Sequence, residues 1–169
     1  MHMSEDAQTA LIFWLGDRLL AESAGATTQQ ILFNEIRDRV AAGSSIEEAA
    51  RSLAATETRA GDFGVEIAGS MLAIVLAEGL KTFWSAYLKE AEERLGKQLA
   101  KVTIDYLKQV FRRDLSGPES GSLRQQIGSA VRKSCERHRV DFQSVEPVLA
   151  EISHAASADT GMSSLSNDA

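Results

Sequence analysis

The chain has 169 residues, of which 44% are hydrophobic and 25% are charged, and it contains 2 prolines and 1 cysteine. This length suits a single domain, and the composition excludes both a disulfide-stapled miniprotein and a wholly disordered chain. Acidic residues near the N-terminus stand where a secretory signal needs a basic region, so we expect a cytoplasmic protein.

The net charge of −6 is distributed unevenly along the chain. Residues 1–96 carry 8 Lys/Arg and 15 Asp/Glu, residues 97–139 carry 10 and 4, and residues 140–169 carry none and 5. Such an asymmetry indicates a partner for the basic block. We expect that partner to be an acidic protein surface, on the chain's own N-terminal part or on another copy. Nucleic acid is not expected, because the acidic chain as a whole repels phosphate.

Apolar residues recur at helical spacing and no segment alternates as a strand does, which predicts an all-α fold of five to seven helices. Three short helices are expected within an N-terminal subdomain, residues 1–60: one over 6–23, one from Thr27 or Thr28 to Ala42, and one capped by Ser44 or Ser45 that ends near Ala55. A linker is expected over 56–61. The residues predicted to face the core are Leu11, Ile12, Leu15, Leu19 and Leu20 in the first helix and Ile31, Leu32, Ile36 and Val40 in the second.

The central segment is predicted to be the scaffold of the fold. Residues 63–77 are apolar on nearly every side of a helix, and an amphipathic stripe follows them. The stripe keeps its phase through Gly96, so either one long helix or a hairpin broken at Gly96 fits the pattern. Glycine is the usual left-handed residue after a helix, which favours the break. The predicted stripe consists of Leu80, Trp84, Tyr87, Ala91, Leu95, Leu99, Val102, Tyr106 and Val110.

Two further helices, over 123–138 and 147–156, are predicted to close the fold, because a Ser-Gly-Pro stop precedes the first and a proline suits the first turn of the second. The inward face of the first would consist of Leu123, Ile127, Val131 and Cys135. Together with the central segment these helices form a second predicted unit over 61–156. The polar residues 157–169 are interpreted as a flexible tail.

The residue types that carry catalysis do not assemble into a recognisable motif. Cys135 and His138 share a helical face among basic residues, but two candidate ligands do not make a metal site. A helical cysteine in an apolar stripe is usually inert. The sequence contains no phosphate-binding loop, nucleophile elbow or Glu-x-x-His pattern. We therefore predict a protein that is not an enzyme and binds no cofactor or metal.

The central segment favours two kinds of function. Gly69, Ala73 and Ala77 form a ridge of small residues that allows helices to approach closely, and a basic amphipathic stretch follows an aromatic zone. We expect first a non-catalytic interaction or assembly module that self-associates or docks a protein partner. The alternative is a bacterial, toxin-like effector that perturbs anionic membranes on activation through residues 63–115.

The charges flanking the apolar segment favour the first of these functions. Only 11 uncharged residues separate Glu66 from Glu78, whereas about 20 apolar residues are needed to span a bilayer. The residues that we expect to make contacts are Glu66, Gly69, Ala73, Ala77, Trp84, Tyr87, Lys101, Lys108, Arg112 and Arg113.

Overall fold

The structure, a computed structural model, describes residues 5–23, 27–60, 64–96 and 102–152, with the backbone alone for residues 5, 27, 54–60 and 64–70. The predicted all-α class is confirmed, since these residues form seven α-helices and no strand. The predicted tail over 157–169 lies outside the described residues. The helices are α1 (Glu5–Glu22), α2 (Thr27–Ala41), α3 (Ile46–Ala60), α4 (Gly64–Leu95), α5 (Ile104–Ser116), α6 (Ser120–His138) and α7 (Glu146–Ala150), with a short 3-10 helix η2 (Phe142–Ser144) before α7.

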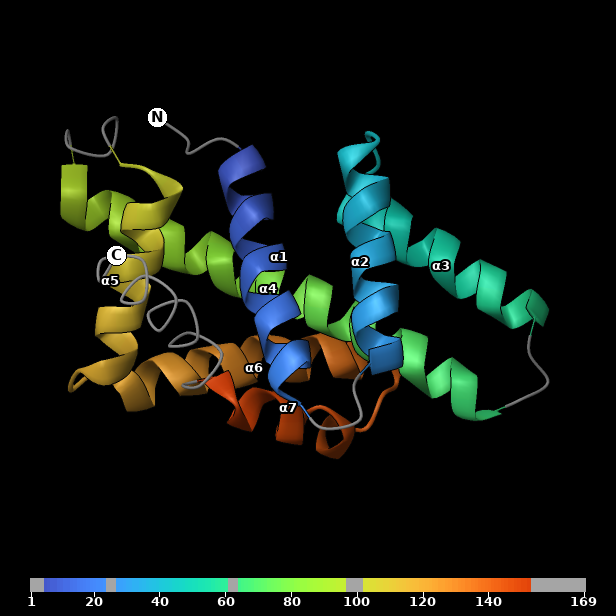
Figure 1. The fold of residues 1–169 in the computed structure, drawn as a ribbon. Helices are drawn as coiled ribbons and strands as arrows, with labels where there is room; N and C mark the ends of the chain where they lie inside the picture. The colour runs from blue at the N-terminus through green and yellow to red at the C-terminus, as the bar shows by residue number, and fades with distance from the viewer. Residues whose placement is uncertain (1–4, 24–26, 61–63, 97–101, 153–169) are drawn as a thin grey trace, which may run out of the picture.

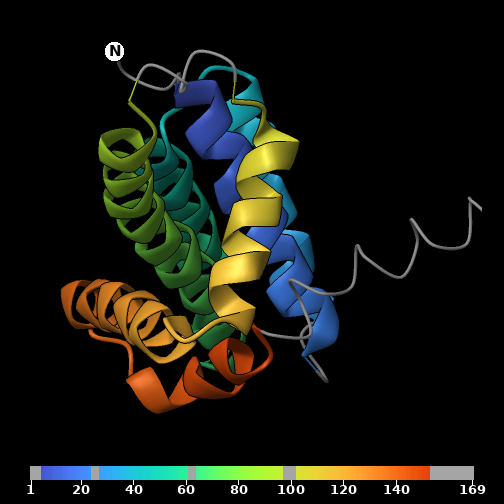
Figure 2. The same ribbon diagram turned by 90° about the vertical axis from the view of Figure 1, so that its left-hand side faces the viewer.

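Helix α4 is the element around which the others are arranged. It contacts α1, α2, α3 and α6, and Figure 1 shows α1 and α2 crossing one side of it while α6 passes beneath. Figure 2 shows α3 beside α4, with α5 across from them and α6 and α7 at one end. Every residue from Leu72 to Leu80 is buried. A helix that is apolar on nearly every side must be surrounded in this way to be stable in water.

The apolar stripe predicted for α1 is confirmed, because Leu11, Ile12, Leu15, Leu19 and Leu20 are all buried. The prediction for the neighbouring helix, α2, is partly wrong. The error arises from the way α2 packs against α1.

In α2, Ile36 is buried as predicted, but Ile31 is 63% exposed and Phe33 is buried instead. The Phe33 ring occupies the space that a side chain at Gly16 of α1 would need, and it also packs edge-on against Phe13 with ring centroids 5.3 Å apart. The inward face of α2 is therefore set by this contact, and the aliphatic pattern of α2 alone does not reveal it.

Helix α3 begins as predicted and ends later than predicted. The Glu48 backbone N–H donates to Ser45 Oγ at 3.0 Å, and the Ser45 N–H donates to the Glu48 carboxylate at 3.2 Å. This reciprocal pair is a capping box. The predicted linker over 56–61 is wrong for residues 56–60, which belong to α3. No glycine or proline occurs between Ser45 and Gly61, so nothing in the sequence stops the helix earlier.

The predicted break at Gly96 is confirmed. Helix α4 ends at Leu95, and Gly96 adopts the left-handed region with φ of 54°. The predicted continuation of the stripe is wrong: α5 buries Leu107, Phe111 and Leu115, while Tyr106 is 42% exposed. Because the helix is broken at Gly96, α5 does not continue the helical register of α4 and buries a different face in the core. Leu99 of the predicted stripe lies outside the described residues.

Helix α6 has the predicted inward face, with Leu123, Ile127, Val131 and Cys135 all buried. It lies very close to α4 at Gly79, where an added Cβ would stand 2.8 Å from the Cα of Val131. The small residue of α4 that permits close helix contact here is thus Gly79. Helix α7 covers Glu146–Ala150, and the predicted extension to residue 156 runs beyond the described residues.

Candidate interaction surface

The contact residues predicted on α4 lie in the core. Ala73, Ala77 and Trp84 are 0% exposed and Tyr87 is 2% exposed. Their side chains are therefore not accessible to a partner while the chain keeps this fold. Glu66 and Gly69 belong to α4 but their side chains are outside the described set, as is the whole of Lys101.

Trp84 and Tyr87 belong to an aromatic cluster that joins α1, α4 and α5. Its ring centroids lie between 4.9 and 6.5 Å apart, in edge-on, tilted and stacked arrangements. Such pairs stabilise a core beyond the area they bury. The Tyr87 hydroxyl donates to Asp114 Oδ2 at 2.8 Å. Burial and this acceptor raise the pKa of Tyr87 far above its ordinary value. The members of the cluster are Trp14, Phe83, Trp84, Tyr87 and Phe111.

The predicted basic residues of α5 meet an aromatic ring of the same chain. Lys108 Nζ lies 5.2 Å and the Arg112 guanidinium carbon 5.4 Å from the centroid of the Trp14 ring on α1. Both distances are within the range of a cation–π interaction. Arg113, by contrast, is exposed, and no ion pair or hydrogen bond of its side chain is found among the described residues. Of the three predicted α5 contact residues, Arg113 is the one that the fold leaves open.

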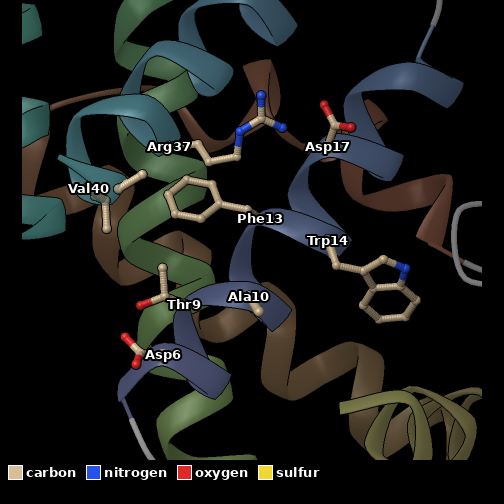
Figure 3. Close-up of a pocket in the computed structure, with 9 residues that line it drawn as sticks. Asp6, Thr9, Ala10, Phe13, Trp14, Asp17, Arg37 and Val40 are labelled. Carbon is tan, nitrogen blue, oxygen red and sulfur yellow. The ribbon is translucent and has the colours of Figure 1, made fainter.

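An open trough with a volume of about 520 Å³ lies between α1 and α2. Figure 3 shows Phe13 pointing from α1 toward Val40 of α2, and Arg37 reaching toward α1. We call this hollow the α1–α2 trough. A second hollow of about 300 Å³ shares Asp6, Thr9 and Val40 with it and continues to the turn between α2 and α3.

The trough lies between α1 and α2, which run in opposite directions (Figure 1). At Gly16 the two helices are in contact through the Phe33 ring. Toward the N-terminus of α1, Thr9 and Phe13 stand opposite Val40 and Arg37, and these side chains line the space between the backbones without closing it. The floor is apolar and the rim is charged, as in many binding sites.

The charges on the rim are not balanced. Lys81, at the second hollow, pairs with Glu47 at 2.5 Å, and Arg37 lies 3.7 Å from Asp38, so each cation has a carboxylate of its own. The hydrogen bond from Lys81 lowers the pKa of Glu47. The rim carboxylates have no such cations.

Asp17 of the trough accepts a hydrogen bond from the Gln30 amide at 3.2 Å and has no ion-pair partner in the described part of the chain. The Asp6 side chain has neither kind of partner there. Two carboxylates, Asp6 and Asp17, and one guanidinium, that of Arg37, thus line the trough, which leaves a net negative charge beside an apolar floor.

A second charged group, Glu78, lies within the core. It is 8% exposed on α4, and its Oε2 lies 2.5 Å from His138 Nε2 and 3.8 Å from Arg137 Nη1, both at the end of α6. A buried carboxylate requires such partners, because its desolvation is costly. The C-terminal end of a helix also favours a cation. The Glu78–His138 contact links α4 to α6, and it engages the histidine that follows Cys135 by three residues in α6.

No catalytic arrangement is found around Cys135 in the described regions. The thiol is 1% exposed, and burial raises its pKa, which opposes formation of the reactive thiolate. No cluster of three or more His, Cys, Asp or Glu side chains suited to a metal occurs within those regions.

One described segment, Met71–Leu95, is long and apolar enough to cross a membrane, with a mean hydropathy of 1.2. Its most apolar stretch is 72% buried inside the molecule. The core helix of a water-soluble fold meets the same criteria of length and composition, so this observation is weak support for insertion.

The trough residues were not recognised as a site from the sequence. Phe13 is 6% exposed and packs largely in the core, while Asp6 and Val40 carry no motif. The one usable signal was the excess of acidic residues before residue 97. No protein-family model, curated protein or solved structure matches the chain.

Proposed function

We propose that the protein is a non-catalytic helical interaction module that associates with copies of itself or docks a protein partner. The observation that carries this proposal is the α1–α2 trough, an open apolar hollow of about 520 Å³ whose rim holds two carboxylates without cationic partners. Open hollows with an apolar floor and a few charged groups are preferred places for binding.

The uneven charge of the chain supports the same function. Residues 97–139 carry 10 Lys/Arg against 4 Asp/Glu, whereas residues 1–96 carry an excess of acidic residues. Surfaces of opposite sign steer association and select partners. On α5 and α6 several of these cations are exposed, among them Arg113, Lys133 and Arg137. The chain thus supplies both signs of charge for contact between molecules.

Sedimentation velocity over a wide range of protein concentration and of salt concentration tests the proposal. Self-association through charged surfaces predicts that the mean sedimentation coefficient rises with protein concentration and falls as salt is added. If the protein stays monomeric throughout, self-association is excluded. The proposal then depends on a second protein that binds this chain with defined stoichiometry. Binding of that protein should be lost when Asp6 and Asp17 are changed to lysine.

A membrane-perturbing action is the second candidate, and the apolar segment Met71–Leu95 is the observation that favours it. Insertion would require α4 to leave the helices that cover it. Dye-loaded vesicles containing phosphatidylserine should then leak when the protein is added, with a pH or salt dependence that follows the uncovering of α4. Absence of both leakage and vesicle co-sedimentation at every pH and salt concentration removes this candidate.

A further inference from the structure

Helix α5 has apolar residues on two opposite faces, and only one of them contacts the core. Leu107, Phe111 and Leu115 are buried. Tyr106 is 42% exposed, Val110 is half-buried, and Arg113 is exposed. Spacings of four and three residues place these last three side chains on one face of the helix. We call Tyr106, Val110 and Arg113 the α5 outer stripe.

The α5 outer stripe has no polar partner among the residues that the structure describes. The Arg113 side chain and the Tyr106 hydroxyl make no hydrogen bond or ion pair with any described residue. Tyrosine and arginine are the residue types most enriched among side chains that dominate binding energy. An exposed aromatic ring flanked by an unpaired arginine on a rigid helix therefore resembles one half of an interface.

The α1–α2 trough has the complementary chemistry. Its floor contains Phe13 and Val40, and its rim contains the carboxylates Asp6 and Asp17 against the single guanidinium of Arg37, so the rim carries a net negative charge. A carboxylate and a guanidinium form strong, directional hydrogen bonds. The apolar floor can pack against the Tyr106 ring and the Val110 side chain, and the rim carboxylates can form ion pairs with Arg113.

A chain cannot fill its own trough with this stripe. Lys108 and Arg112 of α5 face Trp14 on α1. Helical geometry places Tyr106 and Arg113 on the side of α5 away from those two cations. The stripe therefore points away from α1 of its own chain.

We propose that the α5 outer stripe of one copy docks into the α1–α2 trough of a second copy. Tyr106 and Val110 lie on Phe13 and Val40, and the guanidinium of Arg113 lies between the rim carboxylates. This inference rests on the proposed interaction function and specifies the partner and the two surfaces. Because the surfaces differ, the contact is head-to-tail, and copies add until a ring closes or a filament grows.

The test uses two complementary variants of the full chain. The stripe variant, Tyr106→Ser with Arg113→Glu, retains an intact trough. The trough variant, Asp6→Lys with Asp17→Lys, retains an intact stripe. The matched control, Ile31→Ser with Arg51→Glu, removes an apolar side chain and an arginine from exposed positions on α2 and α3. Circular dichroism and denaturant unfolding establish that each variant is folded.

Sedimentation equilibrium measures the assembly of each protein alone and of mixtures. Wild type and control are expected to assemble equally, and each of the other variants alone is expected to associate at least about tenfold more weakly. An equimolar mixture of stripe and trough variants is expected to form a one-to-one dimer and nothing larger, because only one intact stripe can meet one intact trough.

Several outcomes would overturn the inference. If wild type assembles but both variants assemble equally well, self-association stands and this contact is wrong. A mixture that remains monomeric, or a control that is weakened as much as the stripe variant, also refutes it. If wild type is monomeric at every concentration, the contact between copies is refuted. The inference is also refuted if the trough binds a basic helix of another protein and never binds a second copy of this chain.

Discussion

Substitution of Gly79 by alanine tests whether the close contact between α4 and α6 controls stability. An added Cβ would stand 2.8 Å from both the Cα and the Cγ2 of Val131. The Cα belongs to the backbone of α6, so the contact is relieved only if the two helices move apart. Overfilling a core costs typically about 1–3 kcal/mol. Alanine also stabilises a helix by about 1 kcal/mol relative to glycine, which acts in the opposite direction.

Gly128→Ala in α6 separates the two effects, because an added Cβ there meets nothing within 4 Å. We expect Gly128→Ala to raise the free energy of unfolding by up to about 1 kcal/mol. The propensity gain cancels in the difference between the variants, so Gly79→Ala should be less stable than Gly128→Ala by about 1–3 kcal/mol. Urea unfolding followed by far-UV circular dichroism measures both values. Equal stability of the two variants would refute the reasoning.

Three further predictions concern the buried polar groups. His138→Ala should lower the free energy of unfolding by about 1–3 kcal/mol, because it leaves Glu78 without its nearest partner; adding Glu78→Gln should restore part of this loss in the same urea assay. In a Tyr106→Phe background, absorbance at 295 nm should show the Tyr87 phenol ionising only as the protein unfolds, because burial raises its pKa. Since the folded pKa exceeds the ordinary value of 10.0, Tyr87 adds stability below that pH and the contribution is lost as pH rises above it. Cys135 should react with iodoacetamide much more slowly in native protein than in urea, and a rate above that of a free thiol would revive an enzymatic interpretation.

The parts of the fold that were predicted correctly are those in which one helix carries one apolar face. Helix α6 has a single apolar stripe, so only one orientation buries it, and the buried residues match the expected ones. In α1 the expected stripe is buried as well, together with Phe13 beside it. The break at Gly96 was also predictable, because a left-handed residue after a helix is a local property of glycine.

The errors arise where a helix carries apolar residues on more than one face. In α5 the sequence offers Tyr106 and Phe111 on different faces, and burial of Phe111 is decided by the aromatic residues of α1 and α4. In α2 burial of Phe33 depends on Gly16, a residue of another helix. Periodicity within one segment contains no information about such contacts.

The trough could not be predicted for a related reason. It is formed by the spacing of α1 and α2, and its residues are ordinary ones for an amphipathic helix. The imbalance of charge was visible in the sequence, but the local pairing of Lys81 and Arg37 that leaves Asp6 and Asp17 uncompensated depends on the tertiary arrangement.

The positions of the two tryptophans supply an optical reporter of this molecule's surface. Trp84 is 0% exposed in the centre of the aromatic cluster, whereas the partly exposed Trp14 borders the α1–α2 trough. These are the chain's 2 tryptophans, so a Trp84→Phe protein fluoresces from Trp14 alone. Its emission wavelength and its quenching by iodide then follow the occupancy of that side of the molecule, without an attached dye.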